Sequence, residues 1–171
     1  HFASRKALDI DGLGEKIVDE LLSHGLVNDP SDFYSLQAEA LLSLPRMGTK
    51  RVTLLIYAIK ASKGRPLSRL LFGMGVRHVG EEVSRILARR WPSLAALRAM
   101  DWLNAQIDLP QGVGVEIASS LSAFFVHPGH QRMLDRFESL WASPSAGQDL
   151  QAVDRAAEGS EQKVQEGLPC A

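Results

Sequence analysis

Four short glycine turns recur along the chain and constrain its fold more than any other sequence feature. Each turn ends in a glycine that follows an apolar residue, and these last glycines are 34, 32 and 34 residues apart. A leucine stands seven residues after each of them. Repetition at a nearly fixed period indicates that one structural unit is used several times. The four turns are Ile10–Gly14, Leu44–Gly48, Gly75–Gly80 and Leu109–Gly114, and the leucines are Leu21, Leu55, Leu87 and Leu121.

We call these turns one to four, and their last glycines (Gly14, Gly48, Gly80 and Gly114) the anchor glycines. The pattern predicts a tight turn and then a helix of about three turns, because apolar residues three and seven positions after each anchor share one helix face. Three of the four residues at the first of these positions are branched aliphatics, and the exception is Arg51. Glycine suits such a turn because it accepts positive φ and lets another backbone come close.

The start of each predicted helix is a candidate anion site. The first N–H groups of a helix have no intrahelical acceptor, and the helix dipole favours a negative charge there. One such turn is explained equally well by a glycine that only caps a helix. Four turns in register favour a phosphate grip without sequence preference.

Charge is unevenly distributed although the formal net charge is only −1. Between Arg46 and Arg98 twelve basic residues face only two acidic ones, Glu81 and Glu82. The first 45 residues carry three basic and eight acidic side chains. A localised positive centre indicates a polyanionic partner, and this one spans turns two and three.

Composition limits the classes to which the chain can belong. With 45% hydrophobic and 23% charged residues it is typical of a soluble globular protein. No run of 18 apolar residues exists and no signal segment opens the chain, so we expect a cytoplasmic location. The single cysteine, Cys170, cannot form a disulfide framework or a four-cysteine zinc site. Since the chain begins with His1 rather than Met, we expect it to be part of a longer protein.

Turn residues, caps and apolar periodicity together predict an all-α fold. Gly25 is expected to end the first helix as a C-cap, and Ser93 to cap a later one. Asp29-Pro30 has the form of a helix start. Trp91 and Trp102 are expected in the core rather than stacked on bases. The predicted helices are Glu15–Ser23, a short helix after Pro30, Ala38–Leu42, Thr49–Ser62, Leu67 to about Phe72, Glu81–Arg90, Ser93–Met100, Val115–Val126 and a last helix to about Trp141.

These turns match the helix-hairpin-helix motif, and two segments carry a closer resemblance. His1–Lys16 resembles the opening of the helix-hairpin-helix domain of bacterial NAD-dependent DNA ligases, and Gly75–Glu81 is similar to the third hairpin of that family. The resemblance runs from His1 to about Leu140 and includes all four turns. It implies four tandem helix-hairpin-helix motifs in one compact DNA-binding domain, residues 1–142. Residues 143–171, low in large apolar side chains, are expected to form a disordered tail.

The resemblance also implies a function. The parent protein would be an NAD-dependent ligase that seals nicks in DNA replication and repair, near the bacterial nucleoid. NAD, Mg and structural Zn are implied for that parent, with adenylation, OB-fold and zinc modules upstream. No lysine here stands in a Lys-x-Asp-Gly setting, so this region should be non-catalytic and bind none of these cofactors. The family continues into a BRCT domain; either this protein lacks one or the sequence ends before it.

The expected activity is sequence-independent binding of the duplex backbone around a nick, with no catalytic or metal-binding residue in this region. Two alternatives stay open. One is a helix-hairpin-helix module of another DNA-repair protein, such as a nuclease or a branch-migration subunit. The other is a helical protein-interaction repeat, which the basic block disfavours. The candidate DNA-binding residues are Gly12, Leu13, Gly14, Lys16, Arg46, Gly48, Lys50, Arg51, Arg77, His78, Gly80, Gly112, Val113 and Gly114.

Overall fold

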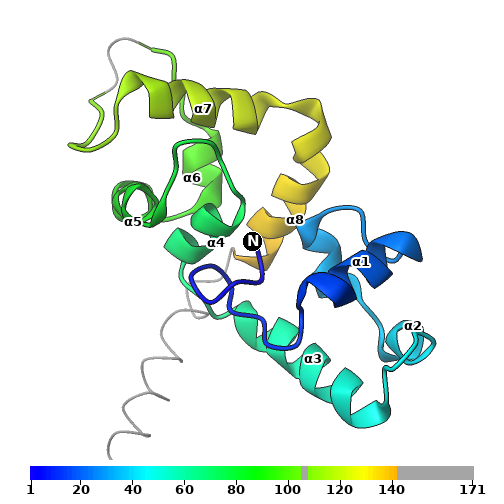
Figure 1. Ribbon diagram of the computed structural model, residues 1–171. Helices are drawn as coiled ribbons and strands as arrows, with labels where there is room; N and C mark the ends of the chain where they lie inside the picture. Colours follow the sequence, from blue (N-terminus) through cyan, green and yellow to red (C-terminus); the bar gives the residue numbers. More distant parts are fainter. Residues whose placement is uncertain (105–107, 142–171) are drawn as a thin grey trace, which may run out of the picture.

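The computed structural model describes residues 1–104 and 108–141, and in these residues all regular elements are helices (Figure 1). The expected all-α fold is therefore confirmed. Residues 143–171, with their predicted disorder, lie outside the described residues. The α-helices are α1 (Glu15–Ser23), α2 (Ala38–Leu42), α3 (Thr49–Ser62), α4 (Leu67–Gly73), α5 (Glu81–Arg90), α6 (Leu94–Arg98), α7 (Val115–Val126) and α8 (Gln131–Leu140). Two short 3₁₀ helices are η1 (Pro30–Ser35) and η2 (Pro128–His130).

Local signals place most of these boundaries. After α1, Gly25 has a φ of 65°, its N–H donates to Leu22 O, and Leu26 N–H donates to Leu21 O. These are the two bonds of a Schellman motif, so the predicted C-cap is confirmed. The Ser93 hydroxyl accepts from Ala96 N–H at 3.1 Å and caps α6, also as predicted.

The helix expected after Pro30 is a 3₁₀ helix, η1. Its N-cap Asp29 accepts from Ser31 N–H at 2.8 Å, while Asp32 accepts from Asp29 N–H at 3.2 Å. This reciprocal capping box satisfies the first donors of a segment that is only six residues long. The short length suits the tighter 3₁₀ geometry.

The helices lie in two groups with α8 between them (Figure 1). One group contains α1, η1, α2 and α3; the other contains α4 to α7. Within the groups α2 packs on α3 and α4 packs on α5, while α8 contacts η1 on one side and α6, α7 and η2 on the other. Turns one and two therefore belong to the first group, and turns three and four to the second.

The repeated leucines form the centre of both groups. Leu21, Leu55, Leu87 and Leu121 are all at most 2% exposed, as the repeat predicts. The apolar residue before each anchor glycine is also buried, with an exposed fraction of 4–5%. Each turn is thus fixed to the core on one side while its glycines face outward. The side chains before the anchors are Leu13, Met47, Val79 and Val113.

Aromatic side chains join the groups at α8. Phe137, fully buried, stacks on Phe2 of the N-terminal segment with ring centroids 5.5 Å apart and meets Tyr34 of η1 edge-on at 6.3 Å. Trp91 and Trp102 are buried in the second group, 4.9 Å apart, and Trp102 Nε1 donates to Leu97 O. Their predicted place in the core is confirmed.

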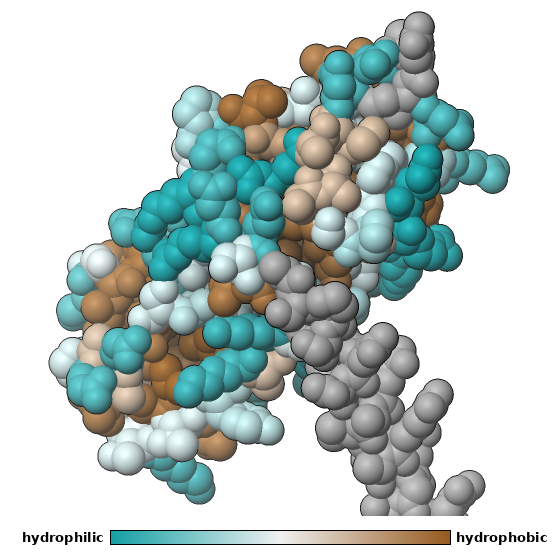
Figure 2. Space-filling view, turned by 180° about the vertical axis from the view of Figure 1, so that it is seen from behind, coloured by the Kyte–Doolittle hydropathy of each residue, from teal (hydrophilic) through white to brown (hydrophobic). Residues whose placement is uncertain are grey.

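The N-terminal segment passes close to α4. A Cβ built on Gly73 would lie 2.9 Å from Leu8 Cδ2, so a larger residue there would require the Leu8 side chain to shift. On the face in Figure 2, hydrophobic side chains appear as separate patches within a hydrophilic surface. Within the two described ranges, the helices lack the combination of length and apolar character needed to cross a bilayer.

Candidate nucleic-acid interface

The four turns share one backbone geometry. In each, the N–H of the residue before the anchor glycine donates to the carbonyl three residues earlier, at 3.0 to 3.4 Å. The residue two positions before each anchor has a φ between 60° and 92°. A positive φ at the third residue of a hydrogen-bonded turn is the pattern of a type II turn. The residues with positive φ are Gly12, Arg46, His78 and Gly112.

The anchor glycines do not have the positive φ that glycine would permit in a turn. Gly14, Gly48, Gly80 and Gly114 have φ values between −78° and −90° with extended ψ, a conformation that any residue adopts. The positive φ expected in the turn therefore belongs to the position two residues earlier. A Cβ on any anchor glycine would meet nothing within 4 Å. Neither backbone strain nor internal packing in the described residues requires glycine there.

Each anchor glycine is the N-cap of the helix that follows. Serine, threonine, aspartate and asparagine are the usual N-caps because their side chains accept from the helix's first N–H groups. None of the anchors supplies such an acceptor. Among residues 1–104 and 108–141, the N–H groups of each anchor and of the next two residues have no hydrogen-bond acceptor. Four clusters of donors without an acceptor in the described residues therefore begin at exposed glycines.

Basic side chains surround the donors of turns two and three. Arg46, Lys50 and Arg51 flank Gly48, and Arg51 Nη1 also donates to Arg46 O at 3.4 Å. Arg77 and His78 form the tip of turn three. All five are exposed, and none forms an ion pair with another described residue. These two turns can bind an anion with backbone and side chains together.

Elsewhere the basic block is partly neutralised. Four of its twelve cations form ion pairs with other described residues; the partners are Asp9 in the N-terminal segment, Glu81 and Glu82 on α5, and Asp135 and Glu138 on α8. Within the basic block, the cations at turns two and three therefore keep their positive charge unpaired among the described residues, while part of the charge elsewhere is neutralised. The four paired cations are Arg65, Arg85, Arg89 and Arg98.

Turns one and four offer backbone donors with little added charge. Lys16 is the one basic residue in the first turn of α1, and it is exposed without an ion pair among the described residues. Turn four carries no cation from Leu109 to Glu116. Leu13 and Val113 have buried side chains, and their N–H groups already donate to Ile10 O and Pro110 O. Any contact of these two turns with a ligand thus falls to the glycines and Lys16.

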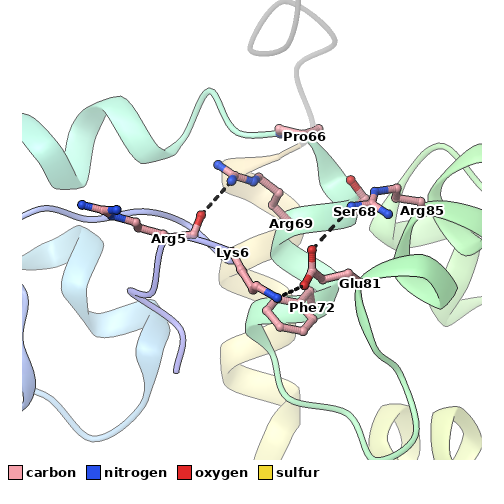
Figure 3. A pocket seen from close by; sticks show the side chains of 8 residues that line it. All are labelled: Arg5, Lys6, Pro66, Ser68, Arg69, Phe72, Glu81 and Arg85. Atoms are coloured by element: carbon pink, nitrogen blue, oxygen red, sulfur yellow. Dashed lines mark hydrogen bonds and ion pairs between the residues drawn. The ribbon is translucent and has the colours of Figure 1, made fainter.

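A second basic group lies beside turn three and was missed in the sequence analysis. Arg5, Lys6 and Arg69 line a pocket with Glu81, the residue after Gly80 (Figure 3). The Arg5-Lys6 pair stands outside the basic block and far from turn three in sequence. Its only sequence signal was its place in the opening segment.

Comparisons with known protein families divide the chain as the fold does. Residues 4–61 match a family described as "SAM-like Helix-hairpin-helix tandem", and residues 69–134 match "Helix-hairpin-helix motif". The first range holds turns one and two, and the second holds turns three and four.

Curated relatives are named DNA ligase. The chain is 42% identical over 155 residues to one from Prochlorococcus marinus (strain MIT 9303), which covers 90% of this chain and 22% of the relative. It is 43% identical over 136 residues to one from Pelotomaculum thermopropionicum, covering 80% and 20%. It is 42% identical over 159 residues to one from Chlorobaculum tepidum, covering 93% and 23%. The chain spans about a fifth of the length of these relatives. The alignments of 155 and 159 residues extend past the expected limit near Leu140.

Proposed function

This chain is a helix-hairpin-helix protein homologous to part of the DNA ligases, and on that basis we propose that it binds duplex DNA by the backbone, without sequence preference. The proposed contacts are the free N–H groups of the four anchor glycines and the cations beside them. Contacts to phosphate position a protein on DNA and carry no sequence information. The proposed binding residues are Gly12, Gly14, Lys16, Arg46, Gly48, Lys50, Arg51, Arg77, His78, Gly80, Gly112 and Gly114, with Leu13 and Val113 as buried supports of their turns.

The anchor glycines are the observation that carries this proposal. Their φ and ψ suit any residue, and space for a side chain is open at each. A side-chain N-cap would stabilise each helix by only about 0.3 kcal/mol relative to glycine, so glycine has a small cost within the protein alone. An external acceptor that approaches the N–H groups closely explains all four positions. Phosphate is such an acceptor, and helix N-termini bind it.

The parent protein's activity is also a proposal. We infer that it is an NAD-dependent ligase that seals nicks during replication and repair, and that this region holds the DNA for adenylation and OB-fold domains elsewhere in the same protein. The reaction needs a lysine that accepts AMP, and no lysine here has the Lys-x-Asp-Gly setting. We therefore assign NAD, Mg and structural Zn to the other parts. In the described part of the chain no three His, Cys, Asp or Glu side chains gather as metal ligands.

We further propose that residues 1–142 act as one DNA-binding domain in the bacterial cytoplasm, at the nucleoid. The contacts of α8 with both helix groups support a single domain.

The test is binding of this protein to nicked duplex, intact duplex and single-stranded DNA across a salt series. We expect duplex binding whose log affinity falls linearly with log salt, with a slope of about −0.9 for each phosphate neutralised. Tighter binding to the nick would favour the ligase assignment over another repair protein. Absence of duplex binding at low salt would contradict the proposal.

A further inference from the structure

A pocket of about 270 Å³ separates the N-terminal segment from α4 and α5. Figure 3 shows the side chains of Lys6 and Glu81 pointing toward each other across it. Lys6 Nζ lies 2.7 Å from Glu81 Oε1, and Arg85 Nη2 lies 3.5 Å from Glu81 Oε2. Arg69 Nη2 donates to the main-chain oxygen of Arg5 at 2.7 Å. The Glu81 carboxylate thus lies among three cations, Lys6, Arg69 and Arg85, whereas the Arg5 guanidinium points away from it.

The pocket adjoins two of the glycine turns. Glu81 is the first residue of α5, directly after the anchor Gly80. Arg5 lines this pocket and also a second one that contains Gly12 and Gly14 of turn one. Arg5 therefore lies next to both the pocket beside turn three and the one at turn one.

The charges favour an external anion. The Arg5 guanidinium has no acceptor among the described residues, and Arg69 uses only a neutral carbonyl. Arg85 forms ion pairs with both Glu81 and Glu82, and its Nη1 lies 2.9 Å from Glu82 Oε2. The Lys6 ammonium, through its hydrogen bond, holds the pKa of Glu81 below its usual value, so that carboxylate is ionised at neutral pH. A backbone phosphate in the pocket could accept hydrogen bonds from the same donors, Lys6, Arg69 and Arg85.

We propose that this pocket binds a backbone phosphate of duplex DNA, and that the Glu81 carboxylate occupies the phosphate's place in the free protein. The inference rests on the proposed DNA-binding function and adds a fifth contact to the four turns. On binding, the phosphate takes over Lys6 and Glu81 turns out to solvent, where its side chain is already 35% exposed. Since exposed ion pairs contribute little to stability, the exchange leaves the fold intact.

The first test compares Glu81→Gln with Glu82→Gln, its neighbour on the same helix turn. Both remove one negative charge near the N-terminus of α5, but only Glu81 lines the pocket. We expect E81Q to raise affinity for a duplex about five-fold, as loss of a nearby like charge implies, and E82Q to raise it less than about two-fold. Equal gains would overturn the proposal, because they would reflect general charge alone.

The second test uses Lys6→Gln with Lys60→Gln as its matched control. Lys60 is an exposed lysine in the last turn of α3, without an ion pair among the described residues. K6Q should reduce the magnitude of the salt slope by about 0.9, the value for one phosphate, and abolish the gain from E81Q in the double variant. K60Q should do neither. A slope for K6Q equal to that of K60Q, or an additive double variant, would overturn the proposal.

The same experiments separate this inference from the proposed function. If the wild-type protein fails to bind a duplex, the function itself is wrong. If it binds and the K6Q and E81Q variants behave as their controls do, only the pocket assignment fails. Competition by poly-glutamate that depends on Lys6, with duplex affinity unchanged by K6Q, would assign the pocket to an acidic protein and also overturn the proposal.

Discussion

At the residue scale the four turns differ most at the position with positive φ. Gly12 and Gly112 occupy it in turns one and four, whereas Arg46 and His78 occupy it in turns two and three. A residue with a Cβ costs about 1 kcal/mol or more in this conformation. Strain of this kind is retained where a side chain has a role, and these two side chains stand beside free helix donors.

We therefore expect Arg46→Gly and His78→Gly to separate stability from binding. Each should leave the free energy of unfolding unchanged or raise it by up to about 1 kcal/mol, because the strain is relieved while the unfolded chain gains freedom. Each should also weaken duplex binding. Urea denaturation and a DNA titration on the same samples measure both. Gly12→Ala, the reverse exchange, should lower stability; loss of stability in R46G and H78G would contradict the account.

The anchor glycines allow a second test at this scale. Gly48→Val and Gly80→Val keep an allowed backbone, and a Cβ at either position meets no described atom within 4 Å, so both should fold. They should weaken duplex binding at least about ten-fold, because a charge-assisted hydrogen bond to phosphate contributes about 1.5–3 kcal/mol. His24→Ala, at the exposed opposite end of α1, is the control. Equal affinities for all three variants, each folded by circular dichroism, would refute the phosphate grip.

At the scale of elements, the sequence predicts helix boundaries best where a capping or helix-breaking residue stands next to the end of the helix. The bounds of α1, α3, α5 and α7 follow from their anchor glycines and apolar periodicity. The 3₁₀ form of η1 was not predicted, because it depends on a reciprocal bond between Asp29 and Asp32. Nor was the pairing of Asp32 with Arg132 and Arg136, since about 100 residues separate the partners.

That pairing makes the contact between η1 and α8 sensitive to acid. Burial raises the pKa of Asp32, but hydrogen bonds from Asn28 N–H, Asp29 N–H, Arg136 and Arg132 outweigh it and lower the pKa from 3.8 to about 2. A lowered folded-state pKa gives stability that is complete above pH 3.8 and is lost as pH falls towards 2. The shift corresponds to about 2 kcal/mol.

The expected result is a loss of about 2 kcal/mol in the free energy of unfolding over this pH range, measured by denaturation at several pH values. Asp32→Asn should lack this component and be less stable near neutral pH. Identical pH dependence of wild type and D32N below pH 4 would show that Asp32 is not the responsible group.

At the scale of the whole molecule, α8 holds the two helix groups together. Phe137 of α8 is fully buried and contacts Phe2 of the N-terminal segment and Tyr34 of the first group. Asp135 and Glu138 of α8 form ion pairs with Arg98 of α6, in the second group. Repeat spacing predicted the four units but not this closure, which depends on long-range aromatic contacts. Phe137→Ala should lower the free energy of unfolding by about 3–5 kcal/mol.

Urea denaturation followed by tryptophan fluorescence and by circular dichroism measures this loss. Because both groups contact α8, wild type should unfold in one transition that is the same for both probes. A loss below about 1 kcal/mol for F137A, or two separate transitions in the wild type, would show that the groups are independent.

In the proposed complex, backbone N–H groups of the anchor glycines hold DNA phosphates. A titration of ¹⁵N-labelled protein with nicked duplex, followed by amide chemical shifts, observes these groups themselves. The account predicts large shifts at Gly14, Gly48, Gly80 and Gly114, and small ones at Gly25 and Gly129, which are exposed glycines outside the turns. Tight binding of DNA with unshifted anchor amides would contradict it.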